Sequence, residues 1–300
     1  MYVPMTKEQL KELITRDIPG DQIDVSNITD MSWLFDKSNY NHPLDTWDVS
    51  NVTNMSYMFN NSKYNQPLGS WDVSKVTNMR CMFAWSQFNH PIGSWNTCKV
   101  MNMSYMFNKS PYNYPLETWN VSQVKYMNDM FNETTYNFPL DLWDTSQVLC
   151  MRSMFMNSTF NHPIGSWNTS KVTDMSFMFD NSIFNHPIGS WDTSNVTDMS
   201  YMFKESEYNH PLKFWDIGQV ISISHMFRES KCTSDISMWD FSNVIYFERV
   251  FDNSKMKPLK FKLIIIQDEI PSNPPNVSFL KSIWATIQFQ LAYYFKLNHH

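Results

Sequence analysis

Tryptophans recur along this chain at a constant spacing and mark a repeated unit. From Trp47 to Trp239 a tryptophan stands at every 24th position without an insertion, and Ile23 takes the same place one unit earlier. A strict period predicts that each unit is one turn of a coil, because 24 residues cannot bury their apolar side alone but stacked units share a core. A second apolar column has the same period: Phe35, Phe59, Phe83, Phe107, Phe131, Phe155, Phe179, Phe203, Phe227 and Phe251.

Each unit contains two local periods. The segment 68–73 has the LxxLxL spacing of a leucine-rich-repeat strand, and its last three residues alternate between apolar and polar side chains. The segment 79–83 places apolar residues at i, i+3 and i+4, which is one face of a helical turn. We therefore predict an α/β repeat solenoid, leucine-rich-repeat-like, over residues 23–260. Each of its ten 24-residue turns has a short parallel strand and a short helical turn, and Trp, Val, Met, Phe and Leu/Ile columns fill the interior.

A polar column follows each tryptophan. The next residue is Asp or Asn, and in most units a serine stands two positions later, as in Asp72 and Ser74. Such pairs cap backbone groups at a bend. A calcium ladder is the alternative, but Asn replaces Asp freely and no DxDxDG-type loop is present. We interpret the column as corner capping.

Residues 1–22 are predicted to form an N-terminal capping helix. Thr6 and Gln9 have the spacing of a capping box, and Pro19-Gly20 would end the helix. Such a helix would cover the open edge of the first turn. Its apolar face would consist of Leu10, Leu13 and Ile14.

Residues 261–300 are predicted to form a C-terminal cap with an apolar helix. Residues 278–297 have apolar side chains at helical spacing, interrupted by Lys281, Gln288 and Gln290. Three interpretations stay open: a packed C-terminal helix, which we favour, a partner-binding helix, and membrane contact, for which the polar interruptions are unfavourable.

Composition narrows the class of protein. Hydrophobic residues make up 42% of the chain and charged residues 17%, and the formal net charge is −6. Nucleic-acid binding is disfavoured because it needs a basic stripe. The four cysteines fall at four different places of the repeat, so a disulfide framework is not expected, and no spacing suggests zinc. The N-terminus does not read as a signal peptide, which favours an intracellular location, a virus-infected host cell included.

The repeat resembles a known family. The runs WDVSNVTNMSYMF (47–59) and YNQPLGSWDVS (64–74) are similar to the BspA-like leucine-rich-repeat surface proteins, in particular to the bacterial surface protein 26-residue repeat or Mycoplasma-type lipoprotein repeat. The resemblance covers residues 23 to about 254 and implies a solenoid without catalytic residues, usually a surface or lipoprotein adhesin. Similar repeats occur in giant viruses, and a composition rich in Asn, Ile, Tyr and Lys suits a large DNA virus. The chain lacks the family's lipobox and wall-sorting motif.

Nearly every polar residue belongs to a column that repeats from turn to turn, whereas an enzyme needs a local set of unlike groups. We find no nucleophile elbow, phosphate loop or HExxH motif, and we expect no catalytic residue, cofactor or metal. His162, His186 and His210 share one column on three successive turns, which is compatible with a metal site or a pH-sensitive stripe. Gln, Tyr and Phe fill the same column elsewhere, so we favour a merely permissive position.

Two variable columns are candidates for recognition of an unidentified protein partner. One lies two positions before each phenylalanine and is often aromatic, and the other lies just before each tryptophan. Aromatic residues anchor protein interfaces, but the rings could equally pack on the next turn. We expect a non-enzymatic protein–protein interaction solenoid, with a cell-surface or virion adhesin as the alternative. The candidate surface consists of Trp33, Tyr57, Tyr105, Phe177, Tyr201, Glu117, Asp141, Lys213 and Phe214.

Overall fold

The computed structural model describes residues 1–256. Contacts divide the chain into two compact units, Met1–Leu259 and Lys260–His300. The predicted C-terminal cap at 261–300 and its apolar helix at 278–297 lie outside the described residues, so those interpretations stay predictions.

The first unit begins with the predicted capping helix. Helix α1 (Lys7–Thr15) starts at Thr6, whose hydroxyl accepts a hydrogen bond from the Gln9 N–H at 3.3 Å. The Gln9 side chain accepts in return from the Met5 N–H at 2.7 Å, one residue before the expected partner. The N-cap and the helix are therefore confirmed. The buried residues of α1 are those of the predicted face, Leu10, Leu13 and Ile14.

Helix α1 ends earlier than predicted. Asp17 adopts a left-handed conformation with φ 58°, its N–H donates to the Ile14 carbonyl at 2.9 Å, and the Ile18 N–H donates to the Leu13 carbonyl at 3.1 Å. This Schellman arrangement closes the helix before Pro19-Gly20 is reached, so the predicted stop signal was wrong. The 3-10 helix η1 (Gly20–Gln22) follows, and Tyr2 forms a parallel bridge with Ile23.

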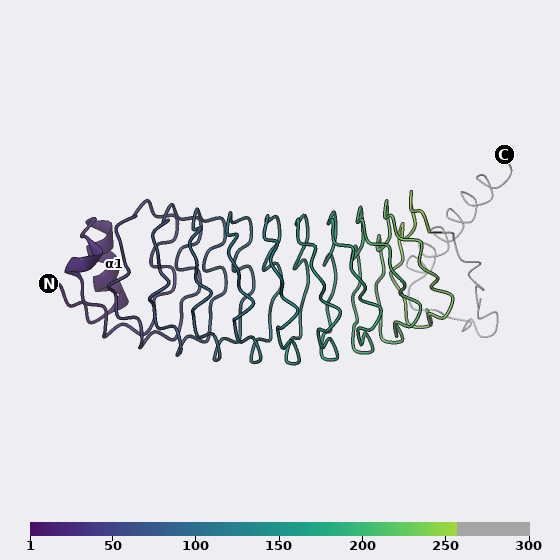
Figure 1. Cartoon of the computed structure of the whole chain (residues 1–300), viewed down its shortest axis with the longest axis horizontal. Coiled ribbons are helices and arrows are strands. Elements are labelled where there is room, and N and C mark those ends of the chain that lie inside the picture. The colour runs from purple at the N-terminus through teal and green to yellow at the C-terminus, as the bar shows by residue number, and fades with distance from the viewer. Residues whose placement is uncertain (257–300) are drawn as a thin grey trace, which may run out of the picture. The chain divides into compact units, whose positions relative to one another are not determined.

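Beyond residue 23, successive 24-residue units lie one after another as stacked turns (Figure 1). Backbone N–H groups of one turn donate to carbonyls of the next, as Cys81 does to Ser104 and Phe83 does to Met106, both at 2.9 Å. One parallel bridge per turn joins the column that runs from Asp30 through Asn54 and Asn78 to Tyr246. Hydrogen bonds between neighbouring turns thus replace the long ladders of a sheet.

The local elements differ from those predicted from the two periods. The bridge forms at Asn78, not on the 68–73 segment, and the 79–83 segment is a series of tight turns rather than a helix. Met82 donates to the Met79 carbonyl at 3.1 Å, whereas the Phe83 N–H is taken by the next turn. Cys81 and Trp85 are left-handed, with φ of 54° and 58°, which no α-helix tolerates. The apolar side chains at i, i+3 and i+4 are therefore buried without a helix.

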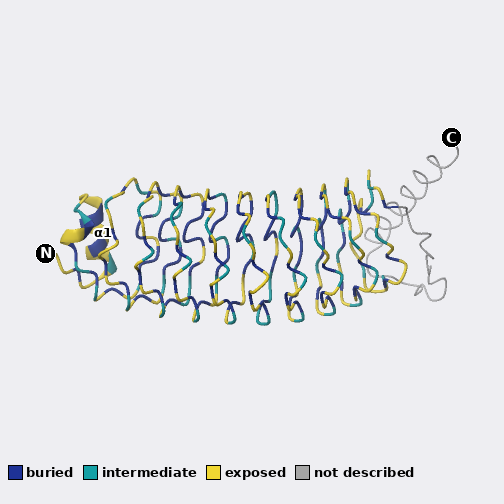
Figure 2. Cartoon of the chain, viewed as in Figure 1, coloured by how far each residue is buried: buried dark blue, intermediate teal, exposed yellow. Residues whose placement is uncertain are grey.

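The apolar columns are buried, as predicted, and Figure 2 shows buried segments recurring from turn to turn. Trp71 and Trp95 stack with centroids 6.4 Å apart and planes 5° apart, and Phe83 stacks on Phe107 at 6.0 Å. The indole N–H of Trp95 donates to the Leu68 carbonyl of the preceding turn at 2.9 Å. Stacked rings and indole hydrogen bonds of this kind therefore join neighbouring turns.

Polar ladders line the corners between the apolar columns. The Asp72 carboxylate accepts from the Ser74 N–H at 3.0 Å, which confirms corner capping at this column. A second ladder was not foreseen. The Asn89 N–H donates to the Asn65 side-chain oxygen at 3.0 Å, and Asn185 donates to Asn161 in the same way at 3.0 Å. These bonds supply acceptors to backbone N–H groups, which apolar side chains cannot do.

Candidate functional site

The column two positions before each phenylalanine reaches the surface where it holds an aromatic residue, whereas its small members Cys81, Asp129 and Ser153 are buried. Its residues are left-handed in every turn, and for Tyr105 the neighbours Met103 and Met106 are fully buried while the ring remains partly exposed. The five predicted aromatic residues of this column form two stacks, Trp33, Tyr57 and Tyr105 in the first and Phe177 and Tyr201 in the second.

The first stack runs over four turns. Trp33 and Tyr57 lie face to face, with centroids 3.8 Å apart and planes 6° apart. In the third turn Cys81 occupies the column, and the guanidinium of Arg80 fills the gap, with its carbon 5.9 Å from the Tyr57 ring centre and 5.6 Å from that of Tyr105. The Arg80 Nε donates to the Tyr57 hydroxyl at 3.1 Å. A cation between two rings continues the stack where an aromatic residue is missing.

The second stack also combines aromatic rings with an arginine, here at its end. The Arg152 guanidinium lies 4.9 Å from the Phe177 ring centre, Phe177 stacks on Tyr201 at 4.4 Å, and Tyr201 stacks on His225 at 4.5 Å. Burial, and after it the charges of nearby arginines, lowers the pKa of His225. The imidazole at the end of this stack is therefore neutral at neutral pH.

Stacking uses the faces of these rings and leaves their edges toward solvent. Trp33 is 45% exposed, and Tyr57, Phe177 and Tyr201 are partly exposed. The rings do pack on neighbouring turns, and the same packing holds the exposed edges in fixed orientations. The arrangement can therefore offer contacts without first ordering its own side chains.

Sequence reasoning missed three further members of this surface. His225 stands in the column by the 24-residue period, and Arg80 and Arg152 precede the column by one position in turns where it holds no aromatic ring. Trp85 was also missed. It is 55% exposed, and the Lys109 ammonium lies 4.2 Å from the ring centre. A side chain that reaches from its own column into a neighbouring one leaves no signal in the sequence pattern of either column.

The remaining four predicted residues lie in a separate part of each turn, the corner before the tryptophan. Phe214 is 83% exposed, Asp141 is exposed, and Lys213 forms an ion pair with Asp235 at 3.4 Å. Glu117 is partly buried, and one of its carboxylate oxygens, Oε2, has no hydrogen-bond partner in the described part of the chain.

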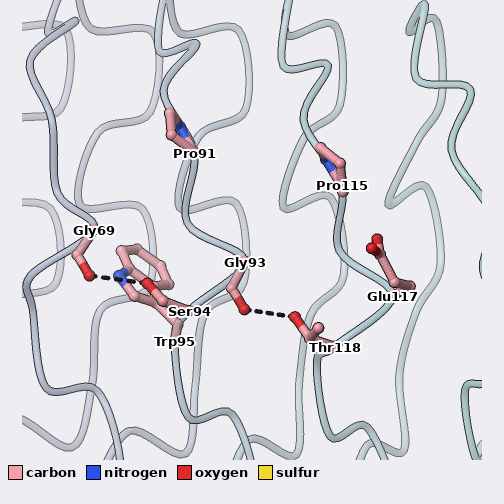
Figure 3. A pocket seen from close by; sticks show the side chains of 8 residues that line it. All are labelled: Gly69, Pro91, Gly93, Ser94, Trp95, Pro115, Glu117 and Thr118. Atoms are coloured by element: carbon pink, nitrogen blue, oxygen red, sulfur yellow. Dashed lines mark hydrogen bonds between the residues drawn. The ribbon is translucent and has the colours of Figure 1, made fainter.

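Glu117 lies at a shallow hollow in this corner, lined also by Gly69, Pro91, Gly93, Ser94, Trp95, Pro115 and Thr118 (Figure 3). In this hollow, side-chain hydroxyl groups form hydrogen bonds between neighbouring turns. The Ser94 hydroxyl donates to the Gly69 carbonyl at 3.0 Å, and the Thr118 hydroxyl donates to the Gly93 carbonyl at 2.6 Å. Other turns repeat this bond, for example from Ser190 to the Gly165 carbonyl at 3.0 Å.

The rings of the histidine column form hydrogen bonds within the chain. Nε2 of His162, His186 and His210 lies 2.9 to 3.0 Å from the carbonyl of an asparagine in the preceding turn. A carbonyl can only accept, so Nε2 must carry the proton and cannot at the same time bind a metal. In residues 1–256 no group of three His, Cys, Asp or Glu residues is placed to hold a metal ion. In the same residues no helix is long and apolar enough to cross a bilayer.

Comparison with known proteins identifies the repeat. The family model described as "Mycoplasma protein of unknown function, DUF285" matches residues 5–111, 85–182 and 156–260. These overlapping matches follow one another along the stacked turns and include α1. No curated protein matches the chain. The family model covers well over half of the chain, and this repeat protein therefore belongs to the DUF285 family of Mycoplasma-type proteins of unknown function.

Proposed function

We propose that this protein is a non-enzymatic, leucine-rich-repeat-like solenoid that binds another protein through the edges of its two aromatic stacks. One observation carries the proposal: partly exposed rings and guanidinium groups are held side by side over several turns, as in Trp33, Tyr57 and Arg80. Tyr, Trp and Arg are the residues that anchor protein interfaces most often.

The energetics favour such a surface. A flexible aromatic side chain loses conformational entropy when it is fixed at an interface, about 0.5–1.5 kcal/mol for each side chain. Rings that already stack, such as Phe177 on Tyr201, have lost that freedom on folding. Binding rather than catalysis is proposed because each polar column repeats similar residues from turn to turn, instead of gathering unlike groups at one place.

A site-specific photo-crosslinking experiment tests this proposal. A benzophenone amino acid is placed at Tyr57, at Tyr201 and, as the control, at the exposed corner residue Asp72, and each protein is irradiated in extract of its own source cells. We expect the same discrete protein adduct from the two stack positions and not from the control. Unlabelled protein should compete for it, and unlabelled protein carrying Tyr57→Ala should compete less well. Adducts of equal yield from all three positions would overturn the proposal.

A surface adhesin is the second candidate, favoured by the match to a Mycoplasma-type family and by the resemblance to BspA-like repeats. An adhesin must be accessible on intact cells. Mild proteolysis of intact source cells should then remove the protein while a cytosolic marker survives. Complete protection until the cells are lysed would exclude this candidate and leave an internal partner.

A further inference from the structure

The hollow beside Glu117 combines open space with an unusual set of polar atoms. It extends over three neighbouring turns, from Gly69 to Thr118, which is about 10 Å at the usual spacing of neighbouring strands. Gly69 and Gly93 contribute no side chain. A Cβ at Gly93 would stand 2.9 Å from the Pro115 carbonyl oxygen, so glycine here permits close stacking and leaves the wall bare.

The side-chain donor groups at the wall already form hydrogen bonds. The Ser94 and Thr118 hydroxyl protons bond to glycine carbonyls, and the indole N–H of Trp95 bonds to the Leu68 carbonyl. Pro91 and Pro115 have no N–H to offer. The hydroxyl oxygens keep free lone pairs, so these groups face a ligand as acceptors.

Glu117 adds a negative charge to this acceptor-rich wall. Its Oε2 is shielded from solvent and has no hydrogen-bond partner, and none of the ion pairs among residues 1–256 involves Glu117. A sheltered carboxylate oxygen without a partner is costly, and a charged donor relieves that cost. Asp45, exposed in the turn before Gly69, has a carboxylate at the same place in the repeat.

We propose that the hollow receives the arginine or lysine side chain of a partner polypeptide, with Glu117 as its anchor. The cationic head donates to the Glu117 carboxylate and to the hydroxyl oxygens of Ser94 and Thr118, while its aliphatic stem lies along the proline rings. This inference rests on the proposed function, because it supplies the chemistry of the protein that is bound.

Calorimetric titration with short peptides tests the inference. The probe is acetyl-Gly-Arg-Arg-Gly-amide, and the matched neutral probe has citrulline, which has nearly the shape of arginine without the charge, in both places. The proteins are the wild type, Glu117→Gln, and Asp141→Asn as the control. Asp141 occupies the same column one turn later, is exposed, and lies outside the hollow. Circular dichroism verifies that all three are folded.

We expect the arginine peptide to bind the wild type and Asp141→Asn alike, and Glu117→Gln about tenfold more weakly, the loss of one charged hydrogen bond. The citrulline peptide should not bind. Equal weakening by both substitutions would show a non-specific charge effect and overturn the inference, as would equal binding of citrulline or no binding to the wild type. These outcomes leave the crosslinking at Tyr57 and Tyr201 untouched, so the two proposals can fail separately.

Discussion

At the scale of single residues, one interior column holds either Tyr or Phe in its first eight turns. Tyr112 and Tyr136 are fully buried, and burial raises the pKa of both phenols above the ordinary value. Neither hydroxyl has a partner at ordinary hydrogen-bond geometry, although the backbone at Ile92 and at Leu116 lies close enough to lower the two pKa values, whereas the Tyr40 hydroxyl donates to the Ile18 carbonyl at 2.9 Å. Most of these hydroxyls are therefore tolerated and do not hold the turns together. The column comprises Tyr40, Tyr64, Phe88, Tyr112, Tyr136, Phe160, Phe184 and Tyr208, and continues with Cys232 and Met256.

Replacement of Tyr112 by Phe should accordingly leave stability unchanged within about 0.5 kcal/mol, because no satisfied hydrogen bond is lost. Trp119→Phe should destabilise by about 2 kcal/mol or more, because it leaves a cavity and removes the indole N–H from the Ile92 carbonyl. Urea denaturation followed by circular dichroism measures both. A large loss from Tyr112→Phe would show that its hydroxyl has a role that the geometry does not reveal.

Asp180 predicts an unusual pH dependence. Burial raises the pKa of Asp180 to about 6 despite the Lys204 ammonium at 3.4 Å. The folded-state pKa lies above the unfolded one, so this carboxyl costs stability above pH 6, and the cost disappears as pH falls toward 3.8. Asp180→Asn should therefore stabilise most at pH 7.5 and progressively less toward pH 4.5.

Thermal melts of the wild type and Asp180→Asn at several pH values provide the measurement. Asp72→Asn is the control with opposite sign, because hydrogen bonds from Ser74 lower the pKa of Asp72. A stabilising effect of Asp180→Asn that grows as pH falls would contradict the assignment.

At the scale of the element, each turn bends at two left-handed residues, and no glycine occupies any of these positions. A left-handed conformation costs about 1–2 kcal/mol for most residues but little for Asn or Gly. Asn61, Asn157, Asn181 and Asn253 stand in the second left-handed column, where Lys37 stands in the first turn. The stacked core evidently outweighs this local strain.

Lys37 allows the strain to be measured at an exposed site, where its φ is 55°. Lys37→Asn should stabilise by about 0.5 kcal/mol, and Lys37→Val should destabilise by about 1–2 kcal/mol, because a β-branched residue resists a left-handed backbone. Lys63, exposed and without positive φ, is the control, and Lys63→Val should change stability little. Equal effects of valine at both sites would argue against backbone strain as the cause.

At the scale of the whole first unit, each turn contacts mainly its neighbours, and α1 adds apolar surface at one end. Leu10 is fully buried, and the Lys7 ammonium reaches Asp30 at 3.0 Å and Ser32 at 2.9 Å in the first turn. A stack of this kind should be stabilised by nearest-neighbour interfaces, so damage at one end should remain local.

Leu10→Ala is expected to cost about 2–5 kcal/mol locally, as a large-to-small core substitution does. Hydrogen exchange by mass spectrometry should show loss of amide protection in the first two turns, near Phe35 and Phe59, and unchanged protection near Phe155. The corresponding change in the middle, Leu116→Ala, should affect the turns on both sides of it. Uniform loss of protection after Leu10→Ala would show a single cooperative globule.

The chain's own pattern was sufficient to predict the repeat, its period, the buried columns and α1. A 24-residue recurrence of Trp and Phe can be satisfied only if like residues meet, and an N-cap such as Thr6 acts through bonds to its immediate neighbours. The aromatic column with Trp33, Tyr57 and Tyr105 was predicted for the same reason, as a set of similar residues one period apart.

Tertiary contacts alone decided how each turn closes and what meets outside it. The segment 79–83 has helical spacing, but the backbone N–H groups of Met79, Cys81 and Phe83 donate to carbonyls of the next turn instead of forming a helix. No local period in the sequence reveals these partners. Arg80 lies between two rings of the first stack, in the turn where Cys81 supplies no ring, and Oε2 of Glu117 is shielded from solvent without a hydrogen-bond partner among residues 1–256. Such contacts join residues about one period apart, and their geometry depends on the stacking of the turns, so they appear only once the turns are in place.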